Sequence, residues 1–98
     1  MSQIAALYST QFKNDDVVFM QNLLKSGVTM RALLYGAIVN NSSKIAKMII
    51  EDSECKELFI NRECIFYAVK NKSSDILKMM IEVGGDVPFI ERLKKLYP

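Results

Sequence analysis

One internal repeat constrains the fold of this chain more than any single residue does. Residues 33–51 and 64–82 are two copies of a nineteen-residue unit, offset by thirty-one positions. The copies read LLYGAIVNNSSKIAKMIIE and CIFYAVKNKSSDILKMMIE, agree at nine positions and keep apolar character at most of the others. A fixed period of about 20 to 50 residues is typical of folds that stack one structural unit. Such folds usually bind rather than catalyse, so the function of this chain should lie on its surfaces.

Each copy has two apolar helical faces separated by a polar break. An i, i+3, i+4 spacing of apolar residues starts at Leu34 and again at Ile45. Between them stands Asn40-Asn41-Ser42-Ser43. Asn tolerates the left-handed conformation that ends a helix, and Ser caps the free N–H groups that begin the next one. The pattern therefore predicts two short helices joined by a tight turn.

A weaker copy of the unit precedes these two. Phe12 and Phe19 stand where the next copy has Ile38 and Ile45, and the segment Asn14-Asp15-Asp16 supplies the polar break. Gly27 and Gly84 follow the second helices of the first and third units, where a left-handed backbone favours glycine. We therefore predict three helical hairpins, at about 2–27, 31–52 and 62–84.

A final amphipathic helix is predicted at 88–97, beginning at Pro88. The residues expected on its inner face are Phe89, Ile90, Leu93, Leu96 and Tyr97. A polar outer face is what the end of a stacked-repeat fold requires. The predicted fold class is all-α, an α-solenoid of stacked helical hairpins with a C-terminal capping helix, as one domain over 1–98.

Several segments resemble the ankyrin repeat. Glu82-Val83-Gly84-Gly85-Asp86-Val87 and, less closely, Lys25-Ser26-Gly27-Val28-Thr29 are similar to the end of that repeat. Tyr35-Gly36-Ala37 and Phe66-Tyr67-Ala68 stand where the family has His-x-Ala. The chain thus resembles a degenerate ankyrin protein of about three repeats. Its Ile, Lys, Asn and Ser bias is similar to that of short ankyrin proteins of large DNA viruses or intracellular bacteria.

The connections between units depart from the family pattern. Only ten positions separate Gly27 from Ala37, which leaves no room for the β-hairpin finger of the family. The second connection, between Asp52 and Arg62, is longer and contains ECKELF, a segment compatible with a helical turn.

The resemblance implies a partner-binding groove lined by the first helix of each unit. Position x of His-x-Ala is variable and exposed in the family, which gives Gly36 and Tyr67 here. A tyrosine flanked by basic residues suits a protein interface, since Tyr and Arg supply large contact area and several hydrogen bonds. Tyr67 could equally cover the neighbouring repeat. The candidate partner-binding residues are Arg31, Tyr35, Gly36, Val39, Arg62, Tyr67 and Lys70.

The residue inventory argues against catalysis and against a metal or a cofactor. The chain has no histidine, so no Ser-His or Cys-His nucleophile pair can form. Cys55 and Cys64 fall short of a four-ligand zinc set, and Cys64 is expected to be a packed, reduced thiol because it takes the repeat position of Leu33. We expect a protein that is not an enzyme and has no cofactor.

Net charge and hydropathy limit the classes of partner that this chain is expected to bind. Thirteen Lys and Arg against eleven Asp and Glu give a formal charge of +2, which argues against nucleic acid as the partner. The apolar stretches are far shorter than the roughly 20 residues of a membrane span. The first ten residues, MSQIAALYST, lack the pattern of a secretory signal. A cytoplasmic location is therefore expected, in the source cell or in a host cell.

The leading functional hypothesis is a non-enzymatic protein–protein interaction module, with a host-targeting or regulatory role. The alternative is a small inhibitor or immunity protein that blocks one enzyme or a defence complex. The sequence does not separate the two hypotheses. It also leaves open whether the chain is a monomer or a weak homodimer, because the ends of a three-unit array can pair with a copy.

Overall fold

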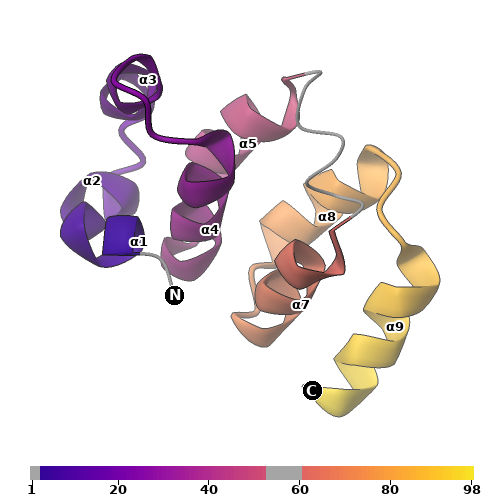
Figure 1. Cartoon of the computed structure of the whole chain (residues 1–98). Coiled ribbons are helices and arrows are strands. Elements are labelled where there is room, and N and C mark those ends of the chain that lie inside the picture. Colours follow the sequence, from indigo (N-terminus) through magenta and orange to yellow (C-terminus); the bar gives the residue numbers. More distant parts are fainter. Residues whose placement is uncertain (1–2, 53–60) are drawn as a thin grey trace.

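The computed structural model describes residues 3–52 and 61–98, and every regular element in these ranges is an α-helix (Figure 1). The all-α fold class is therefore confirmed for this part of the chain. The helices are α1 Gln3–Leu7, α2 Ser9–Lys13, α3 Val17–Lys25, α4 Met30–Asn40, α5 Ser43–Ile50, α7 Arg62–Lys70, α8 Ser74–Glu82 and α9 Val87–Leu96. The segment ECKELF and Cys55 lie outside the described residues.

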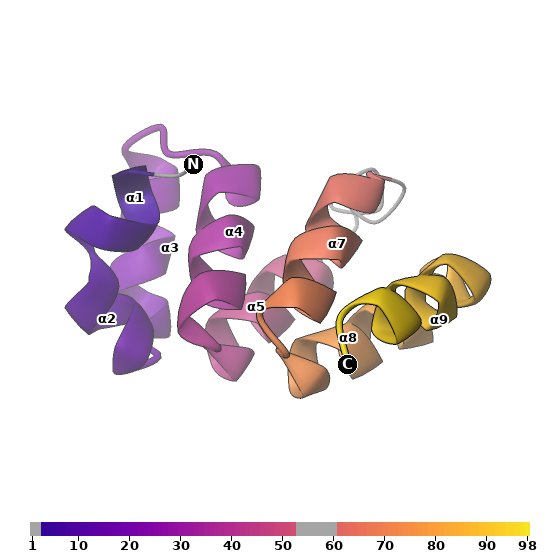
Figure 2. The same cartoon turned by 90° about the horizontal axis from the view of Figure 1, so that it is seen from below.

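The helices form two layers. Helices α1 and α2 pack on α4, α4 packs on α7, and α7 packs on α9, which makes the first layer (Figures 1 and 2). The second layer contains α3, α5 and α8, again in chain order. Helices α4 and α5 form one hairpin and α7 and α8 another, so one hairpin follows the next along the 37 Å length of the molecule.

The three hairpin turns share one backbone geometry. Asp15, Asn41 and Lys72 each adopt a left-handed conformation, with φ of 54°, 54° and 56°. At each turn the amide of this residue donates to the carbonyl three residues earlier, and the next amide donates to the carbonyl five residues earlier. Both bonds satisfy carbonyls that the end of a helix leaves free. The polar breaks in the sequence are therefore helix stops of one kind.

The turn serines do not cap their own helices, which corrects the sequence prediction. Ser42 and Ser73 precede α5 and α8 but make no side-chain bond to those helices. The hydroxyl of Ser42 instead donates to the Phe12 carbonyl at 2.5 Å, and that of Ser73 donates to the Ile38 carbonyl at 2.8 Å. Both serines are buried, so each hydroxyl needs such a partner. The same bond thus ties each of these hairpins to the one before it.

Asp15 caps a helix of the neighbouring hairpin. Its carboxylate accepts from the Lys44 amide at 3.0 Å and from the Ile45 amide at 2.9 Å, the free N–H groups at the start of α5. A carboxylate is favourable at this end of the helix dipole. The acidic residue of the first turn therefore stabilises the second hairpin.

The core runs between the two layers. Its largest fully buried side chains are Phe12, Met20, Leu33, Leu34, Ile38, Ile45, Ile49, Ile65, Ile76, Met80 and Ile90. The thiol of Cys64 is free and fully buried among them, as its repeat position predicted. Burial of each large aliphatic side chain contributes about 1.5–3 kcal/mol before the entropy of ordering is subtracted. The repeated apolar positions are thus the core positions.

The predicted glycine stops are confirmed. Gly27 and Gly84 have φ of +105° and +99°, a region that other residues rarely adopt.

Helix α9 departs from the prediction at its C-terminal end. Ile90 and Leu93 are buried, but Leu96 is 71% exposed and Tyr97 is 40% exposed. The predicted inner face is therefore too wide, because the last turn of the helix, which ends at Leu96, is exposed.

Candidate functional site

The candidate residues lie on the first layer, on α4 and α7. The guanidinium of Arg31 lies 3.3 Å from the Tyr35 hydroxyl, donating to it, and its Cζ lies 5.6 Å from the centroid of the same ring. One helical turn separates the two residues, so α4 itself positions the pair. Arg31 and Tyr35 are thus brought together as one unit.

An aromatic row crosses the first layer from α4 to the end of α9. Its members are Tyr35, Tyr67, Phe66 and Tyr97, and successive ring centroids lie 5.6, 5.5 and 5.6 Å apart. The interplanar angles of 89°, 66° and 80° are edge-to-face arrangements. Each such pair contributes about 0.5–1.5 kcal/mol beyond its buried area. The row therefore links three helices.

Two members of this aromatic row were missed as site residues. Phe66 takes the repeat position of Tyr35, a signal that was available in the sequence. Tyr97 was assigned to the core, and no sequence pattern predicts that its ring meets Phe66 at 5.6 Å. Tyr67 does cover the neighbouring hairpin through Tyr35, yet it stays partly exposed.

Burial sets the protonation of this region. Loss of solvent raises the pKa of Tyr35 to about 12, although the hydrogen bond from Arg31 acts in the opposite direction. That same bond raises the pKa of Arg31. Burial also raises the pKa of Cys64, which disfavours the thiolate that a nucleophile requires. Near neutral pH, Tyr35 is therefore a neutral phenol and Cys64 a neutral thiol, and both lie beside the positively charged guanidinium of Arg31.

The two arginines form ion pairs between neighbouring helices of the first layer. Arg31 pairs with Glu63 of α7 at 3.1 Å, and Arg62 pairs with Asp86 at the start of α9 at 3.2 Å. Arg62 also lies over the Phe89 ring, with Cζ 4.9 Å from the centroid. Exposed ion pairs of this kind contribute about 0–1 kcal/mol each. Arg62 therefore faces α9 and does not join Arg31 beside the tyrosines.

Gly36 is buried, and the expectation that it lies exposed is wrong. A Cβ added there would meet three ring atoms of Phe12 at 2.3–2.8 Å. The missing side chain lets α2 approach α4 closely, so Gly36 is a packing position. Val39 is 39% exposed and Lys70 is exposed, with its Nζ 5.8 Å from the Phe66 centroid. The accessible surface, called here the α4–α7 face, comprises Arg31, Val39, Tyr67, Lys70 and Tyr97.

The described residues hold no group of three or more Cys, Asp or Glu placed to bind a metal ion. None of the helices described is both long enough and apolar enough to cross a membrane. Searches of protein-family models, of curated proteins and of solved structures find no match to this chain.

Proposed function

We propose that this chain is a non-enzymatic protein-interaction module, an ankyrin-like array that binds a macromolecular partner through the α4–α7 face. The repeated turns, the serine bonds between hairpins and the glycine stops support the array. The resemblance of the Gly84 and Tyr67 segments to ankyrin repeats supports it as well.

The aromatic row carries the proposal. Tyr67 is held between Tyr35 on one side and Phe66 on the other, so its ring is oriented before a partner arrives. A side chain that is already ordered loses less entropy on binding. Tyrosine is also among the residues that dominate binding energy at interfaces. The partly exposed ring of Tyr67 is therefore the anchor of the proposed interface.

The charge of the face gives the partner's chemistry. Lys70 lies over the Phe66 ring and pairs with no carboxylate among the described residues. Arg31 and Lys70 flank the tyrosines, and Glu63 already pairs with Arg31. Complementary charge selects partners and speeds association. We propose that the partner protein contacts this face with a surface patch that carries acidic side chains and a recess for the Tyr67 ring.

Affinity purification from cell extract, followed by two variants, tests this proposal. The double variant Tyr67→Ala, Lys70→Ala should weaken retention of the partner by about tenfold or more, as expected for an anchor and its flanking charge. Lys70→Glu alone should weaken it in the same direction, because reversal of this exposed charge leaves the ring packing intact.

Lys78→Ala is the matched control, since it removes one exposed lysine from the second layer. It should leave retention unchanged. Far-UV circular dichroism establishes that each variant is folded. If the Lys70→Glu variant and the double variant are both folded and both retain the partner fully, the α4–α7 face is not the binding surface.

A further inference from the structure

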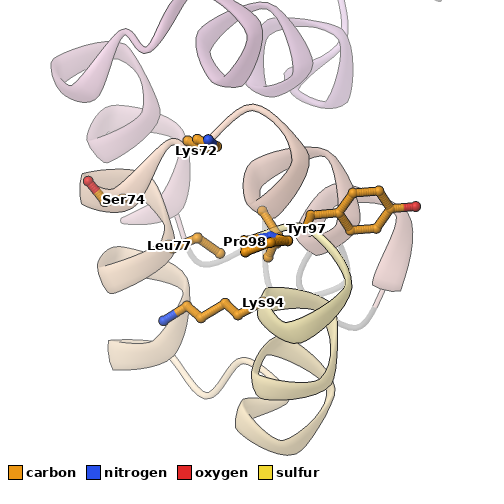
Figure 3. Close-up of a pocket in the computed structure, with 7 residues that line it drawn as sticks. Lys72, Ser74, Leu77, Lys94, Tyr97 and Pro98 are labelled. Atoms are coloured by element: carbon orange, nitrogen blue, oxygen red, sulfur yellow. The ribbon is translucent and has the colours of Figure 1, made fainter.

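A cavity of about 240 Å³ opens at the end of the second layer, between α8 and the end of α9. Among the lining residues, Leu77 and Pro98 lie between Lys72 and Lys94 (Figure 3). Val69, Ser74 and Tyr97 complete its lining. The cavity is called here the end pocket.

The α7–α8 hairpin contributes four lining residues, and most of their counterparts one unit earlier are at the contact with the next hairpin. Those lining residues are Val69, Lys72, Ser74 and Leu77. Thirty-one positions before them stand Ile38, Asn41, Ser43 and Ala46. In that earlier unit Ile38 and Ala46 are fully buried, and α5 packs on α8. The end pocket thus carries the contact positions of a helix–helix junction.

The backbone at the end pocket offers an acceptor to a hydroxyl. The Val69 carbonyl accepts from the Lys72 amide at 3.1 Å, as its counterparts Phe12 and Ile38 accept from their turn residues. Those two carbonyls also accept a serine hydroxyl from the following hairpin. No serine of the described residues reaches the Val69 carbonyl in this way. The second lone pair of this carbonyl therefore suits a hydroxyl donor.

The side chains at the end pocket favour an acidic group. One unit earlier, the Ser43 hydroxyl lies 3.5 Å from the Asp75 carboxylate, and Ser74 is the repeat counterpart of Ser43. Lys72 pairs with no carboxylate among the described residues, and Lys94 lies 3.9 Å from Glu91 on its own helix. The lining residues include no Asp or Glu side chain. An incoming carboxylate would therefore meet the Ser74 hydroxyl and the ammonium group of Lys72, beside a Lys94 that is shared with Glu91.

We propose that the end pocket binds an amphipathic helix of a partner protein that begins Ser-x-Asp or Ser-x-Glu. Its hydroxyl donates to the Val69 carbonyl, its carboxylate pairs with Ser74 and Lys72, and its apolar face packs on Leu77. This spacing is the one by which Ser73 and Asp75 contact the hairpin before them. The end pocket shares only Tyr97 with the α4–α7 face. The Val69 carbonyl, Ser74, Lys72 and Leu77, on which the inference rests, lie outside that face, so the inference does not depend on the proposed function.

Among the described helices, a second copy of this chain offers none of that chemistry that is available. Helix α3 begins with Val17-Val18 after its N-cap Asp16 and has no serine at its start. The only described helix with the Ser-x-Asp spacing is α8, where Ser73 is fully buried and bonded to Ile38. The described helices of a second copy therefore do not supply the proposed occupant.

An NMR titration of the full chain tests the proposal with a defined probe. The probe is an N-acetylated, C-amidated peptide with the sequence of residues 71–83, which carries the Ser-x-Asp start. Since isolated peptides of this length form little helix, binding is expected in the millimolar range. Amide shifts should concentrate at Lys72, Ser74, Leu77 and Lys94. A peptide with Ser73→Ala and Asp75→Lys should bind at least about fivefold more weakly, because it loses the hydroxyl and reverses the charge.

Two chain variants separate the end pocket from general charge attraction. Lys72→Glu should weaken the peptide about fivefold or more, because it reverses a charge that lines the pocket. Lys95→Glu, an exposed residue outside the lining, should have little effect. Absence of shifts at millimolar peptide, or equal binding to both variants, overturns the proposal. Self-association of the free chain that Lys72→Glu abolishes would also overturn it, since a copy would then fill the pocket.

Discussion

Two single residues, the buried serines Ser42 and Ser73, determine how one hairpin contacts the next. Ser42 and Ser73 are 2% and 0% exposed, and each donates to a carbonyl about thirty residues earlier in the chain. A buried hydroxyl without a partner costs free energy, so the bond also fixes the register of one hairpin on the next. These hydroxyls therefore stabilise the arrangement of units rather than the helices that they precede.

Replacement of Ser73 by alanine should lower the free energy of unfolding by about 1–2 kcal/mol, the usual cost of losing a buried hydrogen bond. Urea unfolding followed by circular dichroism measures this change. Ser74→Ala is the matched control, because Ser74 is exposed and should change stability by less than about 0.5 kcal/mol. Equal free energies of unfolding for the two variants would show that the hydrogen bond of Ser73 makes no net contribution to stability.

Residue-level prediction from the sequence succeeded where the repeat itself carries the information. Cys64 and the turn glycines were placed correctly, because their repeat positions or their required φ values determine them. Gly36 was misplaced because its burial depends on the Phe12 ring, which comes from another hairpin. The serines were assigned as helix caps for the same reason. Their acceptors lie thirty or more residues away, beyond any local pattern.

Among the helices, α9 is the last described helix of the first layer, where it packs on α7. Asp86 caps it by accepting from the Phe89 amide at 3.1 Å, and a proline stands in its first turn. Ile90 is fully buried against the core, whereas Leu96 is 71% exposed. Only the first two turns of the helix therefore contribute to packing.

Ile90→Ala should cost about 2–4 kcal/mol, since it removes buried methyl groups and leaves a cavity under α9. Leu96→Ala is a matched aliphatic truncation on the same helix and should change stability by less than about 0.5 kcal/mol. Thermal or urea denaturation of both variants gives the comparison. A Leu96 variant as unstable as the Ile90 variant would mean that the last turn of α9 is packed.

In the part of the chain that the structure describes, the α4–α5 hairpin packs on the α7–α8 hairpin, and α1, α2 and α9 pack on either side of them. The all-helical class of this part and its repeated turns follow from the sequence, because one apolar spacing and one polar break are written three times. The aromatic row was not predictable as a whole. It joins side chains of α4, α7 and α9 whose distances depend on how the hairpins pack. The end pocket was likewise invisible in the sequence, since it arises from what packs beside α8.

The contacts predict that the stability of each hairpin is coupled mainly to its nearest neighbours, and native-state hydrogen exchange of two serine variants tests this coupling most directly. In rows of repeated units, stability is close to a sum of unit terms and neighbour terms, so local changes act locally. Ser42→Ala should reduce protection mainly in α1, α2 and α3, and Ser73→Ala mainly in α7, α8 and α9. If both variants instead lower protection equally in every helix, the chain unfolds as one indivisible unit and the claim is wrong.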